Sequence, residues 1–260
     1  MNESKLHMIA FSETWTGFPS DYEALLAVPD GIFALAGTEQ LYVPAGMRLI
    51  VAYALAETFE TPRFRVHAAS LLKVAYPSIT PIQSANASGG DPNVQDLRDM
   101  PVVFNRDEAL GVDFCASSGA ATGTQRALLM FAENIEPVPE GDAFWIRGSD
   151  ATTTPTADRW STLAALTWEN DPLPEGIYAI IGFVHIGPQG AVGARLVLVG
   201  RSHRPGTISV ESSTERTHRI FYEGSLGVMG TFTAYAPPNI EVFGPADTGH
   251  EVYLRVIRIG

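Results

Sequence analysis

The chain consists mostly of short apolar runs that are separated by turn-forming residues. After residue 31, runs rich in Val, Ile, Leu, Phe and Tyr alternate with segments that contain Gly, Pro, Asn or Asp. The clearest runs are residues 47–55, 64–69, 125–132, 177–186, 194–199, 219–222 and 252–259. Many short strands, each followed by a turn signal, are typical of a β-sandwich or barrel. The sequence therefore predicts an all-β fold.

The N-terminal residues predict a short helix. Ser20-Asp21-Tyr22-Glu23 matches the capping box at a helix start, and residues 22–27 provide about two turns before a turn signal. Residues 1–35 are therefore predicted to form an arm with a short helix. We expect the large rings of this arm to be held against another surface. These candidate interface residues are Trp15, Phe18 and Tyr22.

The two halves of the chain share landmarks in the same order. Pro44-Ala45-Gly46 and Pro174-Glu175-Gly176 each precede a long apolar run. Three more pairs follow: Phe64-Arg65-Val66 with Ala194-Arg195-Leu196, Leu110-Gly111-Val112 with Leu226-Gly227-Val228, and Thr122-Gly123 with Thr248-Gly249. Four ordered pairs predict a duplicated β-domain of about 100 residues, while strand and turn composition alone is the competing explanation. A unit of this size can hold the strands of a jelly roll.

The predicted division of the chain follows from this repeat. Residues 36–140 are the first predicted jelly roll and residues 173–260 the second. Residues 141–172 include a stretch rich in Thr, Ser and Pro. We therefore predict that they form the inter-domain segment.

The charge balance argues against nucleic acid as a direct partner. The chain has 17 Lys and Arg residues against 29 Asp and Glu residues, a formal net charge of −12. Its cationic residues are scattered as far as Arg258, so they do not form a basic stripe for a phosphate backbone. No apolar run approaches the roughly 18 residues of a membrane span, and the first residues lack a secretory-signal pattern. We therefore expect synthesis in the cytosol.

No sequence motif predicts a catalytic, cofactor-binding or metal-binding residue. The six His residues include no pair at the spacing of two or four residues that brings two imidazoles to one metal. Ser117-Ser118-Gly119 lacks the context of a nucleophilic serine, and residues 187–193 lack the Lys of a phosphate loop. His185 and Cys115 lie in apolar runs, so we predict that both are buried structural side chains.

Carboxylates leave hydrolysis and ion binding open. Glu57 with Glu60, or Asp96 with Asp99, are the residue types for acid–base hydrolysis, but sequence spacing does not show whether they meet in a β-fold. Residues 90–96 partly match a calcium loop. They lack the Gly and the terminal Glu of the EF-hand pattern, which favours a solvated loop.

Two further features favour burial between subunits. Residues 177–186 and 194–199 are apolar on both faces, as in strands that are covered on both sides. Only Lys5 and Lys73 are lysines, so most cationic residues are Arg, which is enriched in interfaces. A GC-rich genome would explain the same bias toward Arg.

These features together resemble the double jelly-roll major capsid proteins of tailless icosahedral viruses, many of which contain an internal membrane. The likeness covers residues 36–260 and is carried by the strand starts at Pro44 and Pro174, by Arg204-Pro205-Gly206 and by the two Leu-Gly-Val sequences. It implies two jelly rolls side by side in each chain, a homotrimer of pseudo-hexagonal outline, and a virion shell built from such trimers. At 260 residues the chain is short for this family, so insertions above the barrels would be small or absent.

The resemblance also implies partners and a location. The partners would be further copies of the chain in neighbouring capsomers, together with minor capsid proteins or an internal membrane. The N-terminal arm would lie on the inner side of the shell or reach a neighbour. The expected location is the virion, after assembly in the host cytoplasm. Such a coat subunit would be neither an enzyme nor a cofactor-binding protein.

Two other classes of protein stay open. A tandem β-sandwich that binds or hydrolyses carbohydrate would use aromatic rings as sugar platforms. Its candidate rings are Trp145, Trp160 and Trp168, for which packing in the inter-domain segment is the alternative role. A bicupin-like metalloenzyme is the third class, although its His-x-His motif is missing from the sequence.

Overall fold

The computed structural model of the chain is an all-β structure, as the sequence predicts. It describes residues 2–17, 19–56, 62–73, 78–79, 82–83, 93–116, 122–169, 173–211 and 216–260. Within these residues the helical segments are two short 3₁₀ turns, η1 (Ala69–Lys73) and η3 (Arg219–Phe221). No helix among the described residues has the length and apolar character that a membrane span requires.

The chain divides into two compact units. The N-terminal unit comprises Ile9–Ser88 and Asn93–Phe131, and the C-terminal unit includes Met1–Met8 and Ala132–Gly260. The predicted arm is therefore divided, because residues 2–8 belong to the C-terminal unit. Residues 141–172 were predicted to connect two domains, but the described part of this segment contains strands of the C-terminal unit.

The N-terminal unit contains two sheets. The strands of the first are β1 (Leu6–Thr16), β3 (Leu26–Ala27), β5 (Arg48–Ala56), β8 (Ile82–Gln83), β9 (Gln95–Asp96), β10 (Val102–Val103) and β12 (Thr122–Ala132). The strands of the second are β2 (Glu23–Ala24), β4 (Gln40–Val43), β6 (Arg63–Ala68), β7 (Ser78–Ile79) and β11 (Glu108–Cys115). Buried side chains such as Phe11, Leu129, Phe64 and Phe114 form the core of this unit.

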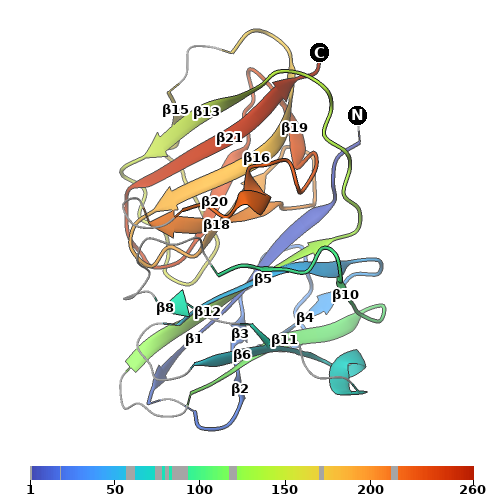
Figure 1. Cartoon of the computed structure of the whole chain (residues 1–260). Helices are drawn as coiled ribbons and strands as arrows, with labels where there is room; N and C mark the ends of the chain where they lie inside the picture. Colours follow the sequence, from blue (N-terminus) through green and yellow to red (C-terminus); the bar gives the residue numbers. More distant parts are fainter. Residues whose placement is uncertain are drawn as a thin grey trace. The chain divides into compact units, whose positions relative to one another are not determined.

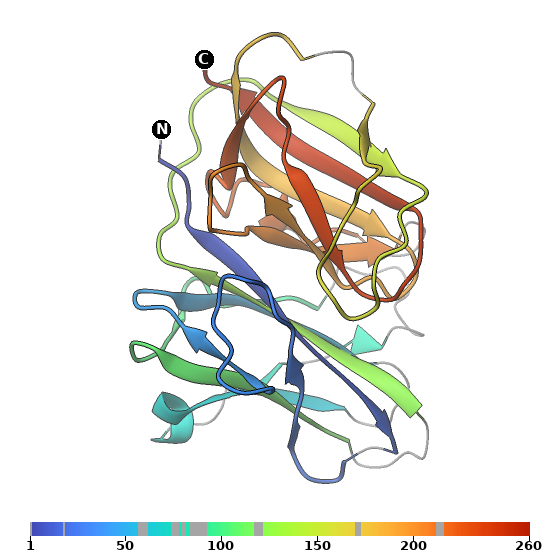
Figure 2. The same ribbon diagram turned by 180° about the vertical axis from the view of Figure 1, so that it is seen from behind.

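The C-terminal unit consists of two groups of strands. One contains β13 (Ala143–Asp150), β15 (Thr167–Trp168), β16 (Ile177–Gly187), β19 (Gly230–Thr233) and β21 (His250–Arg258). The other contains β14 (Ser161–Thr162), β17 (Gly193–Val197), β18 (Gly206–Glu211) and β20 (Asn239–Phe243). A short parallel pairing of β16 with β18 joins the two groups. Figure 1 shows β21 between β13 and β16, and Figure 2 shows the same sheet from behind.

The strands of the two units pair in the same order. In each first sheet, the first strand (β1 or β13) lies beside the last (β12 or β21), the last beside the third (β5 or β16), and the third beside a short sixth strand (β10 or β19). In the second sheet of the N-terminal unit, β11 lies between β6 on one side and β2 and β4 on the other, and β6 pairs with β7. In the second group of strands of the C-terminal unit, β20 lies between β14 and β17, and β17 pairs with β18. Counted along each unit, these are strands 2, 7, 4 and 5. The common order is 1-8-3-6 in one sheet and 2-7-4-5 in the other.

Three of the four landmark pairs in the sequence fall on equivalent strands. The Pro-x-Gly turns precede β5 and β16, the Arg65 and Arg195 segments lie on β6 and β17, and the Thr-Gly pairs lie at β12 and just before β21. The fourth pair was wrong, because Leu110–Val112 lies within β11 whereas Leu226–Val228 lies outside a strand. Gly227 has a φ of +67°, which is incompatible with an extended strand. The structural equivalent of β11 is β20.

The predicted N-terminal helix was also wrong. The residues after the capping-box sequence form β2 and β3, which pair with β11 and β1 respectively. The side chains of this segment alternate, since Leu25 and Ala27 are buried while Leu26 is exposed. A period of two places one set of apolar side chains against the core, so tertiary pairing overrides the local capping signal.

The prediction that the strand is buried on both faces is confirmed for β16. Part of the chain that covers it belongs to the same unit. Tyr178, Ala179, Ile180 and Ile181 are consecutive and all buried. Residues 219–222 of the same unit approach one face, where the Tyr222 backbone lies so close to Gly182 that a side chain at that position would collide with it. The continuous apolar run therefore does not by itself require a second subunit.

Replacement of Phe114 by Ala should destabilise the N-terminal unit strongly. Its buried ring lies 4.9 Å from the Phe64 ring and 5.2 Å from the Trp15 ring, measured between centroids. Loss of such a ring from a packed core costs about 3–5 kcal/mol. Urea unfolding followed by circular dichroism measures this loss. The half-exposed Tyr42 in the same unit is the control, and Tyr42→Ala should cost less than about 1 kcal/mol. Equal losses in the two variants would contradict the assignment of the core.

Candidate functional site

A cluster of polar side chains lies on the outer face of the second sheet of the N-terminal unit. Arg65 on β6 and Asp113 on β11 are directly opposite one another in the strand pairing. Arg65 Nε donates to Asp113 Oδ2 at 2.8 Å, and the guanidinium carbon lies 3.9 Å from the centroid of the Tyr22 ring. We call Tyr22, Arg65 and Asp113 the N-terminal trio. It combines a charge-assisted hydrogen bond with a cation–π contact.

His67 and Gln40 extend the N-terminal trio along the same face. His67 Nδ1 lies 2.6 Å from Asp113 Oδ1, and its Nε2 lies 2.8 Å from the Gln40 side-chain nitrogen. Because an amide nitrogen can only donate, Nε2 is the acceptor in its contact with Gln40. Burial alone would raise the pKa of Asp113, but hydrogen bonds and charge from His67 and Arg65 lower it below the usual range.

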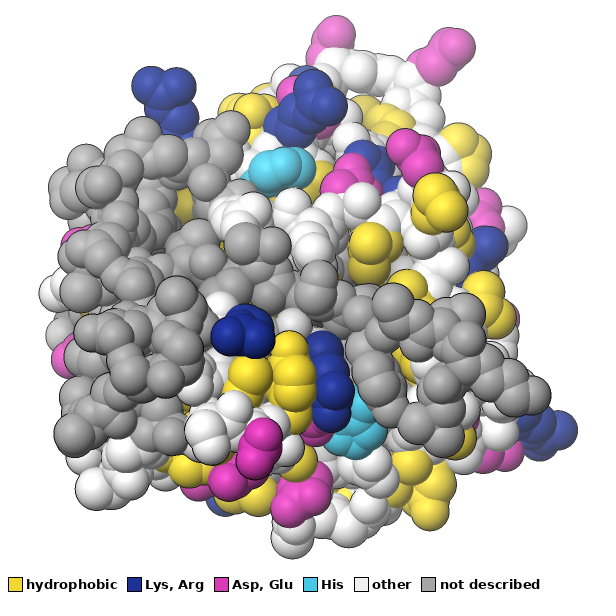
Figure 3. All heavy atoms as spheres, turned by 60° about the horizontal axis from the view of Figure 1, so that its bottom comes forward, with side chains coloured by type: hydrophobic (Ala, Val, Ile, Leu, Met, Phe, Trp, Pro, Cys, Tyr) yellow, Lys and Arg dark blue, Asp and Glu magenta, His cyan; other side chains and the backbone are white. Residues whose placement is uncertain are grey.

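The cluster is partly exposed to solvent. The side chains of Arg65 and His67 are 29% and 21% exposed. Figure 3 shows basic, acidic, histidine and apolar side chains adjoining one another on the face that it brings forward. A ligand could therefore reach the cluster. On binding it would have to replace the contacts that Asp113 makes with Arg65 and His67, or add to them.

The C-terminal unit contains the same arrangement at the equivalent strands. Arg195 on β17 is directly opposite Glu241 on β20, and its Nε donates to Glu241 Oε2 at 2.6 Å. The guanidinium carbon of Arg195 lies 4.1 Å from the ring centroid of Trp160. We call Trp160, Arg195 and Glu241 the C-terminal trio.

The strand registers show how closely the two trios correspond. Ala24 on β2 is paired with Asp113, and Thr162 on β14 is paired with Glu241. Tyr22 and Trp160 each lie two residues before those partners. The Arg and the carboxylate thus occupy the same strand positions in both units, and the aromatic residue directly precedes the equivalent strand, β2 or β14.

The two trios differ in what covers them. Arg195 is only 2% exposed, and one of its terminal nitrogens donates to the Met8 carbonyl at 3.3 Å. The Met8 side chain also packs close to Gly206 at the start of β18. Met8, at the end of the N-terminal segment (residues 2–8), therefore helps to cover Arg195 of the C-terminal trio.

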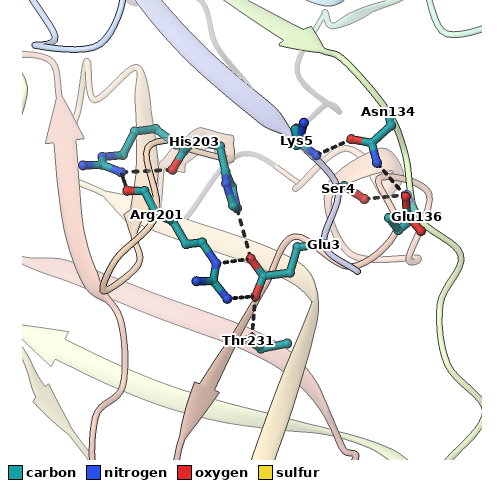
Figure 4. A network of polar contacts seen from close by, with 9 residues as sticks. Glu3, Ser4, Lys5, Asn134, Glu136, Arg201, His203 and Thr231 are labelled. Atoms are coloured by element: carbon teal, nitrogen blue, oxygen red, sulfur yellow. Dashed lines mark hydrogen bonds and ion pairs between the residues drawn. The ribbon is translucent and has the colours of Figure 1, made fainter. Parts of the chain in front are cut away.

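A polar network fixes the N-terminal segment to the C-terminal unit (Figure 4). Arg201 Nε donates to Glu3 Oε2 at 2.7 Å, His203 Nε2 lies 3.4 Å from the same oxygen, and Thr231 donates to Glu3 Oε1. Burial alone would raise the pKa of Glu3, but these three partners lower it far below the ordinary value of 4.5. The carboxylate is therefore the charged centre of the attachment.

Backbone pairing continues the attachment along the segment. The Ser4 amide donates to the Val228 carbonyl at 2.7 Å, and the Glu136 amide donates to the Ser4 hydroxyl at 2.9 Å. Met8 and Leu6 exchange backbone hydrogen bonds with Arg204, which adds the segment as a parallel edge to the chain before β18. Lys5 pairs with Glu133 in a more exposed position.

A second polar chain is buried inside the C-terminal unit. His185 Nδ1 lies 2.6 Å from Ser209 Oγ, His185 Nε2 lies 3.1 Å from His250 Nδ1, and His250 Nε2 lies 3.1 Å from the Asp247 carbonyl oxygen. The order of Ser, His and His resembles a nucleophile with its base and orienting group. The Ser209 hydroxyl is not available to a substrate, however, because the residue is only 1% exposed.

The structural prediction for His185 is confirmed, and that for Cys115 is confirmed by its burial. Sequence reasoning missed Ser209 and His250 as partners of His185. They come from strands that lie 24 and 65 residues further along the chain. Only the register of three separate strands brings them together.

The three candidate interface residues have different environments. Trp15 stacks on Phe114 and packs against the core of its own unit. Tyr22 lies against Arg65 and is half exposed, so its ring edge is accessible. Phe18 lies outside the described residues. Their role in an interface stays a prediction.

The candidate residues of the other function classes are not brought together in the described part of the chain. Trp145 is exposed, Trp160 belongs to the C-terminal trio, and Trp168 packs close to Gly148. Asp96 pairs with the neighbouring Arg98. Glu57, Glu60, Ser117, Ser118 and residues 90–92 lie outside the described residues. Among the described residues, no group of three or more His, Cys, Asp or Glu side chains is placed to hold a metal ion.

Comparison of the sequence with protein-family models and with curated proteins finds no match.

Glu3→Gln should loosen the N-terminal segment. The substitution keeps the shape of the side chain but removes the charge that Arg201 and His203 face. Loss of such charge-assisted hydrogen bonds costs about 1–3 kcal/mol. Hydrogen exchange at the Ser4 and Met8 amides should become faster in the variant. Lys5→Gln is the matched control, because its exposed ion pair contributes about 0–1 kcal/mol.

The same attachment should weaken in acid. An acid with a lowered pKa in the folded state stabilises that state above its ordinary pKa of 4.5, and this contribution is lost as the pH falls further. Glu3→Gln should flatten the pH dependence of Ser4 exchange below pH 4.5. Identical exchange in wild type, Glu3→Gln and Lys5→Gln would contradict the role of Glu3.

Proposed function

We propose that the chain is a double jelly-roll coat subunit, in which each unit is one jelly roll and copies of the chain assemble into a virion shell. The observation that carries this proposal is the strand order common to both units, 1-8-3-6 in one sheet and 2-7-4-5 in the other. Two Greek keys paired in this way form a jelly roll, an architecture that recurs in viral capsid domains.

The two trios support duplication of an ancestral β-unit. Tyr22 and Trp160, Arg65 and Arg195, and Asp113 and Glu241 occupy equivalent positions on strands that pair in the same way. General strand and turn composition does not explain why an aromatic residue, an Arg and a carboxylate recur at equivalent positions. Descent of both units from one precursor explains this recurrence.

A duplicated subunit gives a physical reason for a trimer. Three chains contain six units of similar construction, so a trimer with closed threefold symmetry approximates a sixfold building block. Such a block can occupy a hexagonal position in a shell. Assembly into a shell would therefore explain why the chain contains two similar units.

Exposed apolar side chains on both units are available for contacts between copies. The half-exposed or more exposed residues of the N-terminal unit include Leu26, Ile32, Leu35 and Tyr42, and those of the C-terminal unit include Phe144, Trp145, Ile177 and Tyr235. Leu35 and Tyr42 belong to neighbouring segments, since the Tyr42 amide donates to the Ala34 carbonyl. Apolar side chains that gather on a surface favour association with another surface.

The mass of the purified protein in solution tests this proposal. Three chains of 28.0 kDa predict a particle of about 84 kDa, or a much larger assembly. Light scattering coupled to size exclusion measures this mass over a range of protein concentrations. A 28.0 kDa monomer at every concentration would contradict the coat proposal.

Two charged substitutions sharpen the test. Leu35→Glu and Tyr235→Glu each place a charge on an exposed apolar position, and at least one of them should lower the mass toward that of the monomer. Arg106→Glu is the control, because Arg106 is a polar side chain that is 81% exposed. If only Arg106→Glu, and neither apolar substitution, dissociated the assembly, a role for the apolar side chains would be contradicted.

A further inference from the structure

Three polar side chains are buried where two sheets of the C-terminal unit join. His185 on β16, Ser209 on β18 and His250 on β21 are 0%, 1% and 3% exposed. His185 and Ser209 begin the parallel pairing of β16 with β18, which extends over only three residue pairs. The centroids of the two imidazole rings lie 5.3 Å apart and their planes are at 20°. The polar chain therefore lies at the connection between the two groups of strands.

One carbonyl oxygen determines the proton positions in the neutral form of this chain. The Asp247 carbonyl can only accept, so His250 Nε2 carries a proton, and in a neutral His250 the other nitrogen, Nδ1, is then the acceptor. His185 Nε2 must then donate to His250 Nδ1, which leaves His185 Nδ1 to accept from the Ser209 hydroxyl. Both imidazoles are neutral in this arrangement, and every ring nitrogen has a partner.

An added proton requires the chain to rearrange. At His250 Nδ1 it would face the proton on His185 Nε2 across 3.1 Å unless that proton moved to His185 Nδ1 and the Ser209 hydroxyl turned round to accept it. At His185 Nδ1 it would require the Ser209 hydroxyl to turn round, and the resulting charge would be fully buried. Burial, with a smaller contribution from His250, lowers the pKa of His185 to about 3.

The carboxylates around the two His residues do not cancel the lowering of the imidazole pKa by burial. Burial lowers the pKa of His250, whereas the Asp247 carbonyl and the charges of Asp150 and Asp247 act in the opposite direction. Asp150 on β13 already accepts hydrogen bonds from the Thr152, Thr153 and Ala165 amides. Among the described residues, nearby acidic side chains include Glu251, which is bound by Arg147 and Tyr253, Glu169, which is bound by Arg147 and Ser149, and Glu211, which pairs in register with Gly187.

We propose that the neutral His185–His250 pair is an acid-sensitive latch, which holds β16 against β18 and β21 and opens when acid places a charge on the buried pair. The consequence is local to the C-terminal unit, since all the groups involved belong to it. The latch does not depend on the coat function. In a coat subunit it would make the connection between the sheets weaker in an acidic compartment than in the cytosol.

The sign of the effect follows from proton binding. A His that stays neutral in the folded state stabilises that state above its ordinary pKa of 6.5, and this stability is lost as the pH falls toward the lower folded value. Each such imidazole lowers the folding constant about tenfold per pH unit over that range.

Hydrogen exchange of the full chain between pH 7.5 and 5.0 tests the latch. After correction for the intrinsic effect of pH, the amides of residues 185–187 and 209–211 should open at least about tenfold more often at the lower pH. The variant His185→Gln with His250→Gln keeps a donor and an acceptor at each site but does not titrate. It should lose most of this pH dependence.

The matched control is His218→Asn, which removes another imidazole from the same unit. Asn retains the ability of His218 to cap η3, so the variant should behave as wild type. An unchanged opening of residues 185–187 and 209–211 in wild type between pH 7.5 and 5.0 would overturn the proposal. Equal acceleration in wild type and the double variant would also overturn it. If the double variant does not fold, titration of the wild-type imidazoles by NMR decides, since midpoints near 6.5 for both His185 and His250 would exclude a latch.

Discussion

The pairing of the first strand with the last strand is the constraint on which each unit depends. In the C-terminal unit, β13 and β21 are paired over eight consecutive residue pairs, from Ala143 with Ile257 to Asp150 with His250. In the N-terminal unit, β1 and β12 occupy the same positions. This pairing closes a loop of about 100 residues, so its entropic cost has to be met by the contacts that it makes possible. It also places the last strand between the first and the third, which leaves the second, fourth, fifth and seventh strands to form the opposing sheet.

The opposing sheet is where the two units acquire different properties. Both contain an Arg between a carboxylate and an aromatic ring, but Arg195 is buried and Arg65 is partly exposed. A buried ion pair is stabilising only when hydrogen bonds satisfy the charges that burial removes from water. The N-terminal segment supplies one such bond through the Met8 carbonyl. In the N-terminal unit, the His67 ring lies against Asp113, and the side chains of Arg65 and His67 stay partly exposed.

The sequence predicts a strand well where a turn signal is followed by a long apolar run. It predicts a strand poorly where the strand forms only because it pairs with a distant part of the chain. The equivalence of the strands that begin after Gly46 and Gly176 follows from a turn before a long apolar run. The segment after Ser20 has the local signal of a helix, yet Leu25 and Ala27 face the core as strand residues. Its partners on β11 lie about 90 residues away in the chain, and no local pattern records them. The partnership of His185 with His250 was unpredictable for the same reason, since it depends on the register of β16 with β21.

One chain contains two β-units with the same strand order, and we propose that they serve a symmetric assembly. Electron microscopy of the purified particles, averaged along their symmetry axis, tests this claim most directly. We expect six lobes of similar size arranged around a threefold axis, two from each chain. Particles with one lobe per chain, or single chains that do not associate, would contradict it.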